Sequence, residues 1–146
     1  MPTWPAAAYS RPASIAARGP EGQRASRSLG EDRRHASDLF GALDDLAAEV
    51  GATRSDLGLV FAGVGPGSYT GLRVGAATAL GLMRGAQADV LGIPSFDAIA
   101  MDGLAAGERG AVLRNAFGGH LYIASYGRTD AEVHALTAPA CVQPTD

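Results

Sequence analysis

The stretch from Gly63 to Gly85 constrains the fold of this chain most, because a glycine-rich turn runs directly into a helix-forming segment. It reads GVGPGSYTGLRVGAATALGLMRG, and a strand-like run from Leu57 to Ala62 precedes it. Strand, glycine turn and helix together bring backbone N–H groups towards one point, where they can bind an anion. The sequence therefore poses a choice between a phosphate-binding loop and a structural corner.

Three known site motifs fail in this turn. The P-loop needs a lysine, and the chain contains none. Gly65, Gly67 and Gly71 give G-x-G-x-x-x-G, which is one residue longer than the dinucleotide fingerprint. Around Ser68 the first glycine of a nucleophile elbow is displaced. The simpler interpretation is a structural turn in which Gly67 adopts a positive φ and Ser68 or Thr70 caps the helix. The candidates for contact with a phosphate are Gly65, Gly67, Ser68, Thr70 and Gly71.

The helix predicted from Gly71 to Gly85 carries only two charges, Arg73 and Arg84. A helix that is apolar on nearly all sides is buried over most of its circumference, and in a short chain a partner can supply part of that burial. Each glycine inside a helix costs about 0.5–1 kcal/mol relative to alanine. Gly75 and Gly81 therefore predict that another backbone passes close to the helix.

The clearest helix is predicted from Asp32 to Val50, where apolar residues recur at helical spacing. Asp32 is placed to cap its start and Gly51 to occupy the position after its end. Its acidic residues make a solvated face. His35 has no second histidine or cysteine at helical spacing, so a structural role is favoured over metal binding.

The remaining elements are shorter. Strands are predicted at 13–18 and 23–29 around a turn, at 90–93, at 111–117 and 120–126 as a hairpin around Gly118 and Gly119, and at 132–136. Ser95 is placed to cap a helix covering 96–104. Strand, helix, strand and helix in succession predict a right-handed crossover and parallel pairing. His120 and His134 could face each other across strands, but two histidines alone make a poor metal site.

Composition excludes several classes of protein. The net charge of −3 gives no electrostatic case for direct binding of nucleic acid. One cysteine, Cys141, excludes an internal disulfide framework and fits a reducing compartment. No apolar run approaches the roughly 20 residues of a membrane span, and the N-terminus does not have the pattern of a signal peptide. We expect a cytoplasmic protein without a membrane partner, and with no catalytic residues, no cofactor and no metal site.

Three segments carry a resemblance to a known family. They are GPGSYTGLRVG, the preceding DLGLVFAG and the following GIPSFDAIA, and the match extends from about Arg33 to Tyr126. They resemble the TsaB (YeaZ) family, the non-catalytic subunit of the bacterial machinery that makes threonylcarbamoyladenosine in tRNA. Residues 115–122 still match the sequence pattern of the family, but less closely. The paired histidines that bind metal in the catalytic paralogue are missing here.

The resemblance implies an α/β fold of the actin-like ATPase class, in which a three-strand antiparallel meander precedes parallel strand–helix units. Residues 1–105 would form the N-terminal lobe, and 106–146 a partial second lobe of hairpin and tail. The segment from Trp4 to Ser10 would be the first strand of the meander. It contains Pro5 and a row of alanines, and it lacks the acidic residue that helps bind the metal–nucleotide in this superfamily, which argues against ATP hydrolysis.

The resemblance also implies how the chain would work. It would be a scaffold that pairs through its first two helices with a catalytic TsaD-like paralogue, beside the ATPase subunit of the same complex, or with a second copy of itself. The implied interface residues are Leu39, Leu43, Leu72, Gly75, Ala76, Ala79, Leu80 and Met83. Two alternatives stay open: a small nucleotide-binding enzyme of the same fold, and a degenerate paralogue with no role in tRNA modification.

Overall fold

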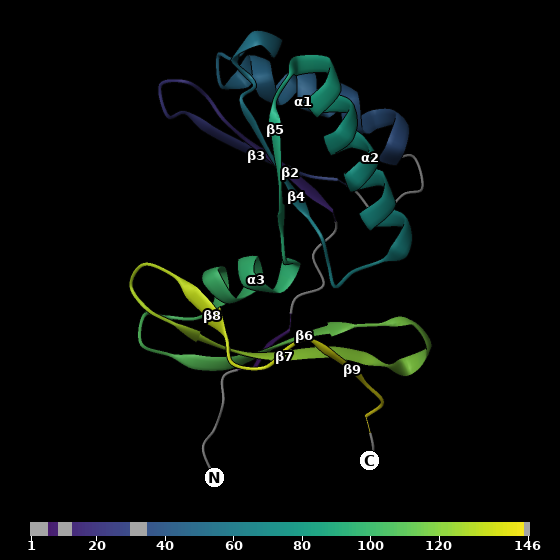
Figure 1. Ribbon diagram of the computed structural model, residues 1–146, viewed down its shortest axis with the longest axis vertical. Coiled ribbons are helices and arrows are strands. Elements are labelled where there is room, and N and C mark those ends of the chain that lie inside the picture. The colour runs from purple at the N-terminus through teal and green to yellow at the C-terminus, as the bar shows by residue number, and fades with distance from the viewer. Residues whose placement is uncertain (1–5, 9–12, 30–34, 145–146) are drawn as a thin grey trace. The chain divides into compact units, whose positions relative to one another are not determined.

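The computed structural model describes residues 6–8, 13–29 and 35–144 (Figure 1). They belong to two compact units, one of residues 1–10, 63–72 and 92–146 and one of residues 11–62 and 73–91. The division at residue 105 expected from the sequence stays a prediction. In chain order the elements are β1 (Ala6–Ala8), β2 (Ser14–Arg18), β3 (Arg24–Ser28), α1 (His35–Glu49), a 3₁₀ turn (Arg54–Asp56), β4 (Leu59–Gly63), α2 (Tyr69–Ala86), β5 (Asp89–Ile93), α3 (Ser95–Gly103), β6 (Arg109–Asn115), a 3₁₀ turn (Phe117–Gly119), β7 (Leu121–Arg128), β8 (Val133–Ala135) and β9 (Ala140–Val142).

Helix α1 packs on the β2–β3 hairpin in the unit formed by residues 11–62 and 73–91. Its apolar side buries Leu39, Leu46 and Val50, as the helical periodicity predicts. Gly51, at φ +66, ends the helix: its N–H donates to the Ala48 carbonyl, and the N–H of the next residue donates to the Ala47 carbonyl. This pair of bonds is the Schellman arrangement that favours glycine. The predicted cap at Asp32 lies outside the described residues.

The hairpin turn lies very close to the end of α1. A Cβ added to Gly19 would be 2.2 Å from the Val50 carbonyl oxygen, a backbone atom that cannot move independently. Gly22 adopts φ +92 in the same turn. Glycine at position 19 is therefore required by the packing of the turn on the helix end.

Strands β4 and β5 form a second pair in this part of the chain. The Asp89 N–H donates to the Gly58 carbonyl, and further along the Val64 N–H donates to the Ile93 carbonyl. Residue numbers increase in the same direction along both strands, so the strands are parallel, as the crossover rule predicts. Near the far end of α2, the Arg54 guanidinium donates to the Gly85 carbonyl.

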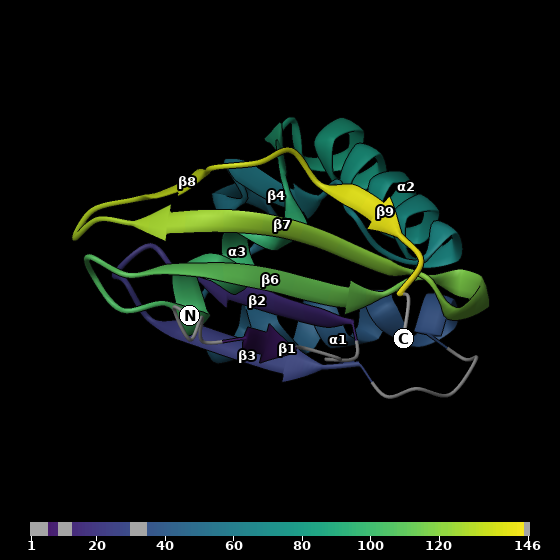
Figure 2. The same ribbon diagram turned by 90° about the horizontal axis from the view of Figure 1, so that it is seen from below.

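The other unit is a sheet in the order β1-β6-β7-β8, with β9 also paired to β7 and α3 packed on the sheet (Figures 1 and 2). The predicted hairpin is present, because β6 and β7 pair antiparallel through the turn at Gly118 and Gly119. Strand β9 was not predicted. The buried core comprises Phe96, Ala100, Leu104, Val112, Ala124 and Tyr126.

The N-terminal strand differs from the expected meander. Only Ala6–Ala8 is described, and it pairs parallel with β6, whereas the expectation placed it beside β2. β2 and β3 pair with each other as expected. A run of alanines has no large side chains to fix its register or partner, so the sequence of this segment specifies its neighbour weakly.

Two smaller expectations are also wrong. The N-cap position of α3 is Pro94, and no side chain caps it; Ser95 is the first helical residue. His120 and His134 do not pair across strands, because His134 lies opposite Gly127 and His120 precedes β7. Within the described ranges, no group of histidine, cysteine and acidic residues could hold a metal ion.

Side chains from the sheet secure both ends of α3. The Tyr126 hydroxyl donates to Asp97 Oδ1 at 2.7 Å in the first turn of the helix. Arg128 donates to the carbonyl oxygens of Met101 and Leu104 at the other end. A cation at a helix C-terminus satisfies carbonyl groups that have no partner within the helix. These contacts, together with the apolar core, hold α3 on the sheet.

We predict that Gly19→Ala lowers the free energy of unfolding by about 1–3 kcal/mol, because the new methyl group overlaps the Val50 carbonyl. Denaturant titration measures the change. Gly41→Ala is the matched control: it lies in α1 with nothing within 4 Å of the added Cβ, so we expect it to raise stability by about 0.5–1 kcal/mol. Equal effects of the two substitutions would contradict the packing described for the turn.

We also predict that the contribution of Tyr126 to the stability of the fold depends on pH. Burial, followed by the hydrogen bond to Asp97, raises the pKa of its phenol well above the ordinary value of 10.0. The folded state therefore keeps this proton when the unfolded state releases it, so the contribution to stability is complete below pH 10 and is lost as the pH rises above it.

Tyr126→Phe should lower the free energy of unfolding by about 1 kcal/mol at neutral pH and should show a smaller further loss at about pH 11. Denaturant titrations at both pH values measure this. Tyr122→Phe, at a half-buried tyrosine packed against the same core, is the control. If Tyr126→Phe and wild type lose equal stability above pH 10, the phenol does not have the environment described.

Candidate functional site

The glycine turn joins β4 to α2 and is tied to the segment that ends β5. The Val64 N–H donates to the Ile93 carbonyl at 2.9 Å, and the Ser95 N–H donates to the Gly65 carbonyl at 2.8 Å. Gly65 is buried and adopts φ +99, a conformation that other residues rarely adopt. The expectation that Gly67 has the positive φ is wrong, because Gly65 has it.

Ser68 caps α2, as one of the two predicted alternatives. Its Oγ accepts the N–H of Gly71 at 3.1 Å, and its carbonyl accepts the N–H of Leu72 at 3.0 Å. This is the usual N-cap geometry for serine. Thr70 lies within the first turn of the helix and is exposed. The cap fixes where α2 begins.

Arg114 reaches the same turn from β6. A Cβ added to Gly67 would lie 3.7 Å from Arg114 Nη1 and 3.9 Å from Cζ, so the guanidinium lies against the Gly67 backbone. The sequence analysis missed this residue, because its strand is remote in sequence and belongs to no known motif. A guanidinium beside first-turn N–H groups is chemically suited to an anion.

The expected interface residues of α2 lie on different sides of the helix. Ala79 is buried within the chain, with Val74, Thr78 and Leu82 half-buried near it at helical spacing. Gly75, Ala76 and Leu80 are exposed, and Leu80 is 49% exposed. Leu72 and Met83 are half-buried. Helix α2 therefore has an apolar side towards its own unit and a second apolar side that is exposed.

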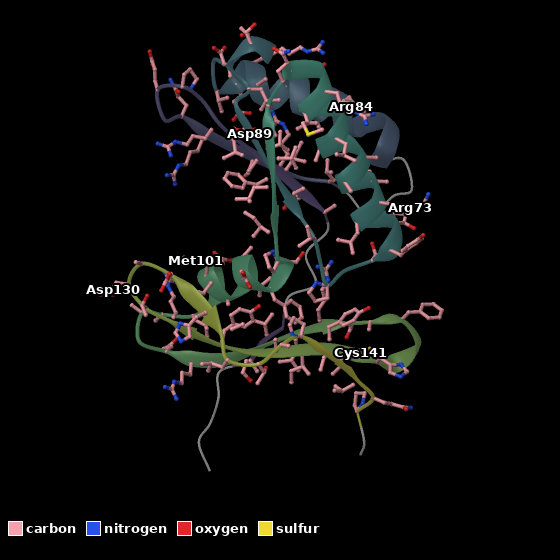
Figure 3. All side chains as sticks on the ribbon, viewed as in Figure 1. Arg73, Arg84, Asp89, Met101, Asp130 and Cys141 are labelled. Atoms are coloured by element: carbon pink, nitrogen blue, oxygen red, sulfur yellow. The ribbon has the colours of Figure 1, made fainter. Side chains whose placement is uncertain are left out.

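The exposed side is made of small and apolar residues between two arginines. Arg73 and Arg84 lie towards the two ends of α2 (Figure 3). We call the exposed residues between them, Gly75, Ala76, Ala77, Leu80 and Gly81, the outer face of α2.

The prediction that a backbone passes close to Gly75 and Gly81 is wrong for the described chain, since nothing lies within 4 Å of an added Cβ at either position. Both glycines therefore lower the stability of the helix relative to alanine, and no contact within the described chain compensates for this loss. The space beside them is open to another molecule.

On α1, Leu39 is buried and Leu43 is half-buried. Leu39 belongs to the core of its own unit and is not available to a partner. Phe40, which the sequence analysis did not select, is 53% exposed. The sequence could have indicated this, because Phe40 follows Leu39 and so lies at the border of the buried apolar stripe of the helix.

None of the described helices is both long and apolar enough to cross a bilayer. Cys141 is a free, exposed thiol on β9 (Figure 3). The 3₁₀ turn before β4 has a capping box, in which the Thr53 hydroxyl and N–H both bond Asp56 and hold the pKa of that carboxyl below its ordinary value.

Comparison with known proteins gives a consistent family. The family model for "TsaD: tRNA N6-adenosine threonylcarbamoyltransferase" matches residues 31–146. The chain is 28% identical over 115 residues to the tRNA threonylcarbamoyladenosine biosynthesis protein TsaB of Escherichia coli, covering 77% of this chain and 50% of that protein. It is 37% identical over 68 residues to TsaB of Haemophilus influenzae, covering 47% of this chain and 29% of that protein.

A solved structure agrees with these relatives. YeaZ from Pseudomonas aeruginosa superposes with a TM-score of 0.78 at 28% identity, covering 90% of this chain and 62% of that one. The chain spans about half the length of the Escherichia coli relative. The likeness confirms the α/β, actin-like ATPase class of fold that the resemblance implied. The chain belongs to the family that the TsaD model describes, and within it is a TsaB/YeaZ member.

Proposed function

We propose that this chain is a non-catalytic scaffold subunit in the biosynthesis of threonylcarbamoyladenosine in tRNA, and that it docks through the outer face of α2. The observation that carries the proposal is that face itself: Ala76 and Leu80 are exposed, and no other part of the described chain approaches Gly75 or Gly81. The names of the relatives supply the pathway.

Small residues on an exposed helix suit a helix–helix contact. Without bulky side chains between them, two helices approach closely and their ridges and grooves interlock. Leu80 supplies an apolar anchor, and Phe40 on α1 is a further exposed apolar side chain. Interfaces of this kind depend on a few central residues, and a polar rim surrounds them. Arg73 and Arg84 at the ends of the outer face suit such a rim.

The proposed partner is a TsaD-like catalytic subunit, in a complex that also holds an ATPase subunit, with a second copy of this chain occupying the same face when the partner is absent. We infer that the chain is not the catalyst. Its N-terminal segment contains no acidic residue before Glu21, and the sequence lacks a helical pair of histidines for a metal. Its net charge of −3 gives no reason to expect direct contact with tRNA.

We predict that Ala76→Glu weakens association by about 100-fold or more. The substitution buries a carboxylate in a small-residue contact without a partner, which costs several kcal/mol, and each 1.4 kcal/mol is tenfold in affinity. Light scattering over a dilution series, with the chain alone and mixed with the TsaD-like subunit, measures the dissociation constant. Because Ala76 is exposed in the chain, the variant should fold normally.

Ala98→Glu is the matched control, since it makes the same change at an exposed alanine of another helix, α3. It should leave association unchanged. Loss of association in both variants would indicate a general effect of charge, and retention in both would place the interface elsewhere than on the outer face of α2.

The second candidate function is nucleotide binding at the glycine turn, and the position of Arg114 against Gly67 favours it. Under the scaffold proposal, isothermal titration with ATP and magnesium should give no binding tighter than millimolar. An actin-like enzyme would bind more tightly, and Arg114→Gln would then reduce the affinity by about tenfold or more through loss of a charge-assisted hydrogen bond. ATP binding tighter than millimolar that Arg114→Gln weakens would contradict the scaffold proposal and favour a nucleotide-binding enzyme.

A further inference from the structure

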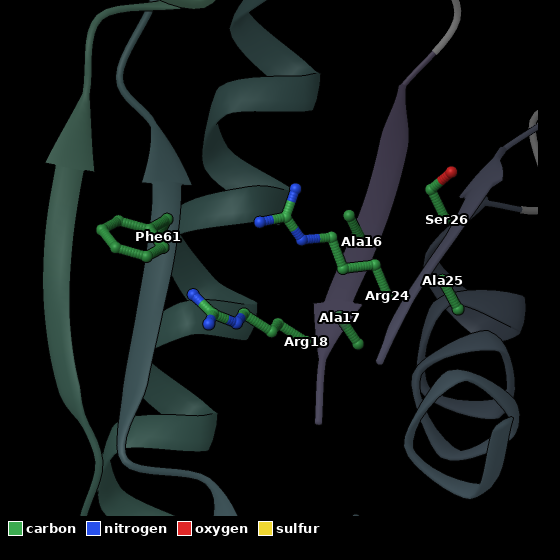
Figure 4. Close-up of a pocket in the computed structure, with 7 residues that line it drawn as sticks. All are labelled: Ala16, Ala17, Arg18, Arg24, Ala25, Ser26 and Phe61. Atoms are coloured by element: carbon green, nitrogen blue, oxygen red, sulfur yellow. The ribbon is translucent and has the colours of Figure 1, made fainter. Parts of the chain in front are cut away.

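An open, polar hollow of about 570 Å³ lies at the C-terminal end of α2, in the unit formed by residues 11–62 and 73–91. The 3₁₀ turn before β4 and the segment that joins α2 to β5 line it. The lining residues are Arg54, Ser55, Arg84, Gly85, Ala86 and Gln87. None of them is acidic or aromatic. The hollow beside β2 in Figure 4 is different, because alanines and Phe61 give it an apolar side.

The end of α2 holds Arg54 at this hollow. The guanidinium donates to the Gly85 carbonyl through Nη2. A Cβ added to Gly85 would lie 2.5 Å from that nitrogen and 3.5 Å from Cζ, so a methyl group at this position would displace the guanidinium. The carbonyl takes one of the five N–H groups of a guanidinium, which leaves donors for a ligand. Arg54 is therefore an oriented donor group.

Arg84 brings a second positive charge to the same hollow. It lies in the last turn of α2 and is exposed (Figure 3). It has no ion pair or hydrogen bond with another described residue. The nearest acidic residues in the sequence, Asp56 and Asp89, do not line the hollow, and Asp56 is held by the hydroxyl and N–H of Thr53. Two guanidinium groups thus share one hollow without a carboxylate in its lining, and like charges repel each other.

Gln87 has a backbone conformation that is unusual for its residue type. It follows the last residue of α2 and adopts φ +58, where glycine is the usual residue after a helix. A side chain destabilises this conformation. The chain therefore keeps a carboxamide in the lining of the hollow, at a position where glycine would fold more easily. The turn itself explains a glycine there, but not a glutamine.

We propose that this hollow binds a phosphate group, held by the guanidinium groups of Arg54 and Arg84, with the Ser55 hydroxyl and the Gln87 carboxamide as further donors. Guanidinium groups bind phosphate through paired, charge-assisted hydrogen bonds. An anion bound by both arginines also offsets their repulsion. The lining offers no aromatic side chain on which a nucleobase could stack, so the site recognises the phosphate and not a base.

The phosphate belongs either to a free oxyanion or to the backbone of a nucleic acid, since both present the same group to the arginines. The hollow is open, so both can enter it. The attraction is local, because the chain as a whole carries a charge of −3 and salt screens charges beyond about 8 Å. The proposal is separate from the scaffold proposal: the test uses the chain alone, and Ala76→Glu should not change its result.

The test titrates the full, ¹⁵N-labelled chain at low ionic strength with inorganic pyrophosphate and, separately, with an oligouridylate of about six nucleotides. We expect a dissociation constant below about 1 mM for at least one probe, with shifts of the amide signals of Ser55 and Gln87. Binding of pyrophosphate would identify a free oxyanion as the ligand class. Binding of the oligonucleotide alone would identify a backbone phosphate.

Arg84→Gln should weaken this binding by about tenfold or more, because it removes a charge-assisted hydrogen bond. Arg84 is exposed, so the variant should fold. Arg54→Lys keeps the charge but loses the planar fork, and should weaken binding by about threefold or more. Arg109→Gln is the matched control: it removes the same charge from an exposed arginine of the other unit and should bind as wild type.

Three results would overturn the proposal. The first is the absence of saturable binding of pyrophosphate up to about 10 mM and of the oligonucleotide up to about 1 mM. The second is an equal loss in Arg84→Gln and Arg109→Gln, which would indicate a general effect of charge. The third is binding that survives in Arg84→Gln but is lost in Arg114→Gln, with shifts at Gly67 and Ser68, which would place the phosphate at the glycine turn.

Discussion

Two backbone hydrogen bonds between the glycine turn and the end of β5 set the positions of the elements around them. Val64 bonds Ile93, and Gly65 accepts the N–H of Ser95. The turn donates the first bond and accepts the second, and Gly65 adopts φ +99, where a side chain would be strained and would also approach Leu72. The turn ends with the Ser68 cap, which fixes the start of α2. Its bond to Ser95 holds the first residue of α3. A structural role therefore accounts for Gly65 and Ser68 without a bound phosphate.

Helix α2 has two apolar sides. One side buries Ala79 and half-buries Leu82 within its own unit. The other side leaves Ala76 and Leu80 exposed beside two glycines that meet nothing in the described chain. An exposed apolar side is unfavourable in water for a chain that stays alone, but it can be buried against a partner when the chain is a subunit of a complex. This is the physical reason why we propose a scaffold and not an independent enzyme.

Local sequence signals predicted α1, the β2–β3 hairpin, the β6–β7 hairpin and the β4–α2–β5 unit, because each has a strong periodicity or a glycine at its turn. The partner of β1 could not be predicted, since alanines carry no side-chain pattern that selects a neighbour. Which glycine of the turn has the positive φ depends on the bond from Ser95, which is a tertiary contact.

The candidate site was harder to predict than the fold. Arg114 comes from a strand remote in sequence, and only the register of β6 brings it to Gly67. The periodicity of α2 could not distinguish its inner side from its outer face, because both are apolar. Ala79 was therefore grouped with exposed residues, although it is buried within the chain. Leu39, on α1, was also expected at the interface and is buried as well.

The most direct test of the account is the level of threonylcarbamoyladenosine in bulk tRNA, measured by mass spectrometry in host cells depleted of this chain and complemented with variants. The account predicts that depletion lowers the modified nucleoside, that wild type and Ala98→Glu restore it, and that Ala76→Glu does not. An unchanged level after depletion would contradict the account and would indicate a degenerate paralogue without a role in tRNA modification. Full restoration by Ala76→Glu would contradict the assignment of the outer face of α2 as the interface.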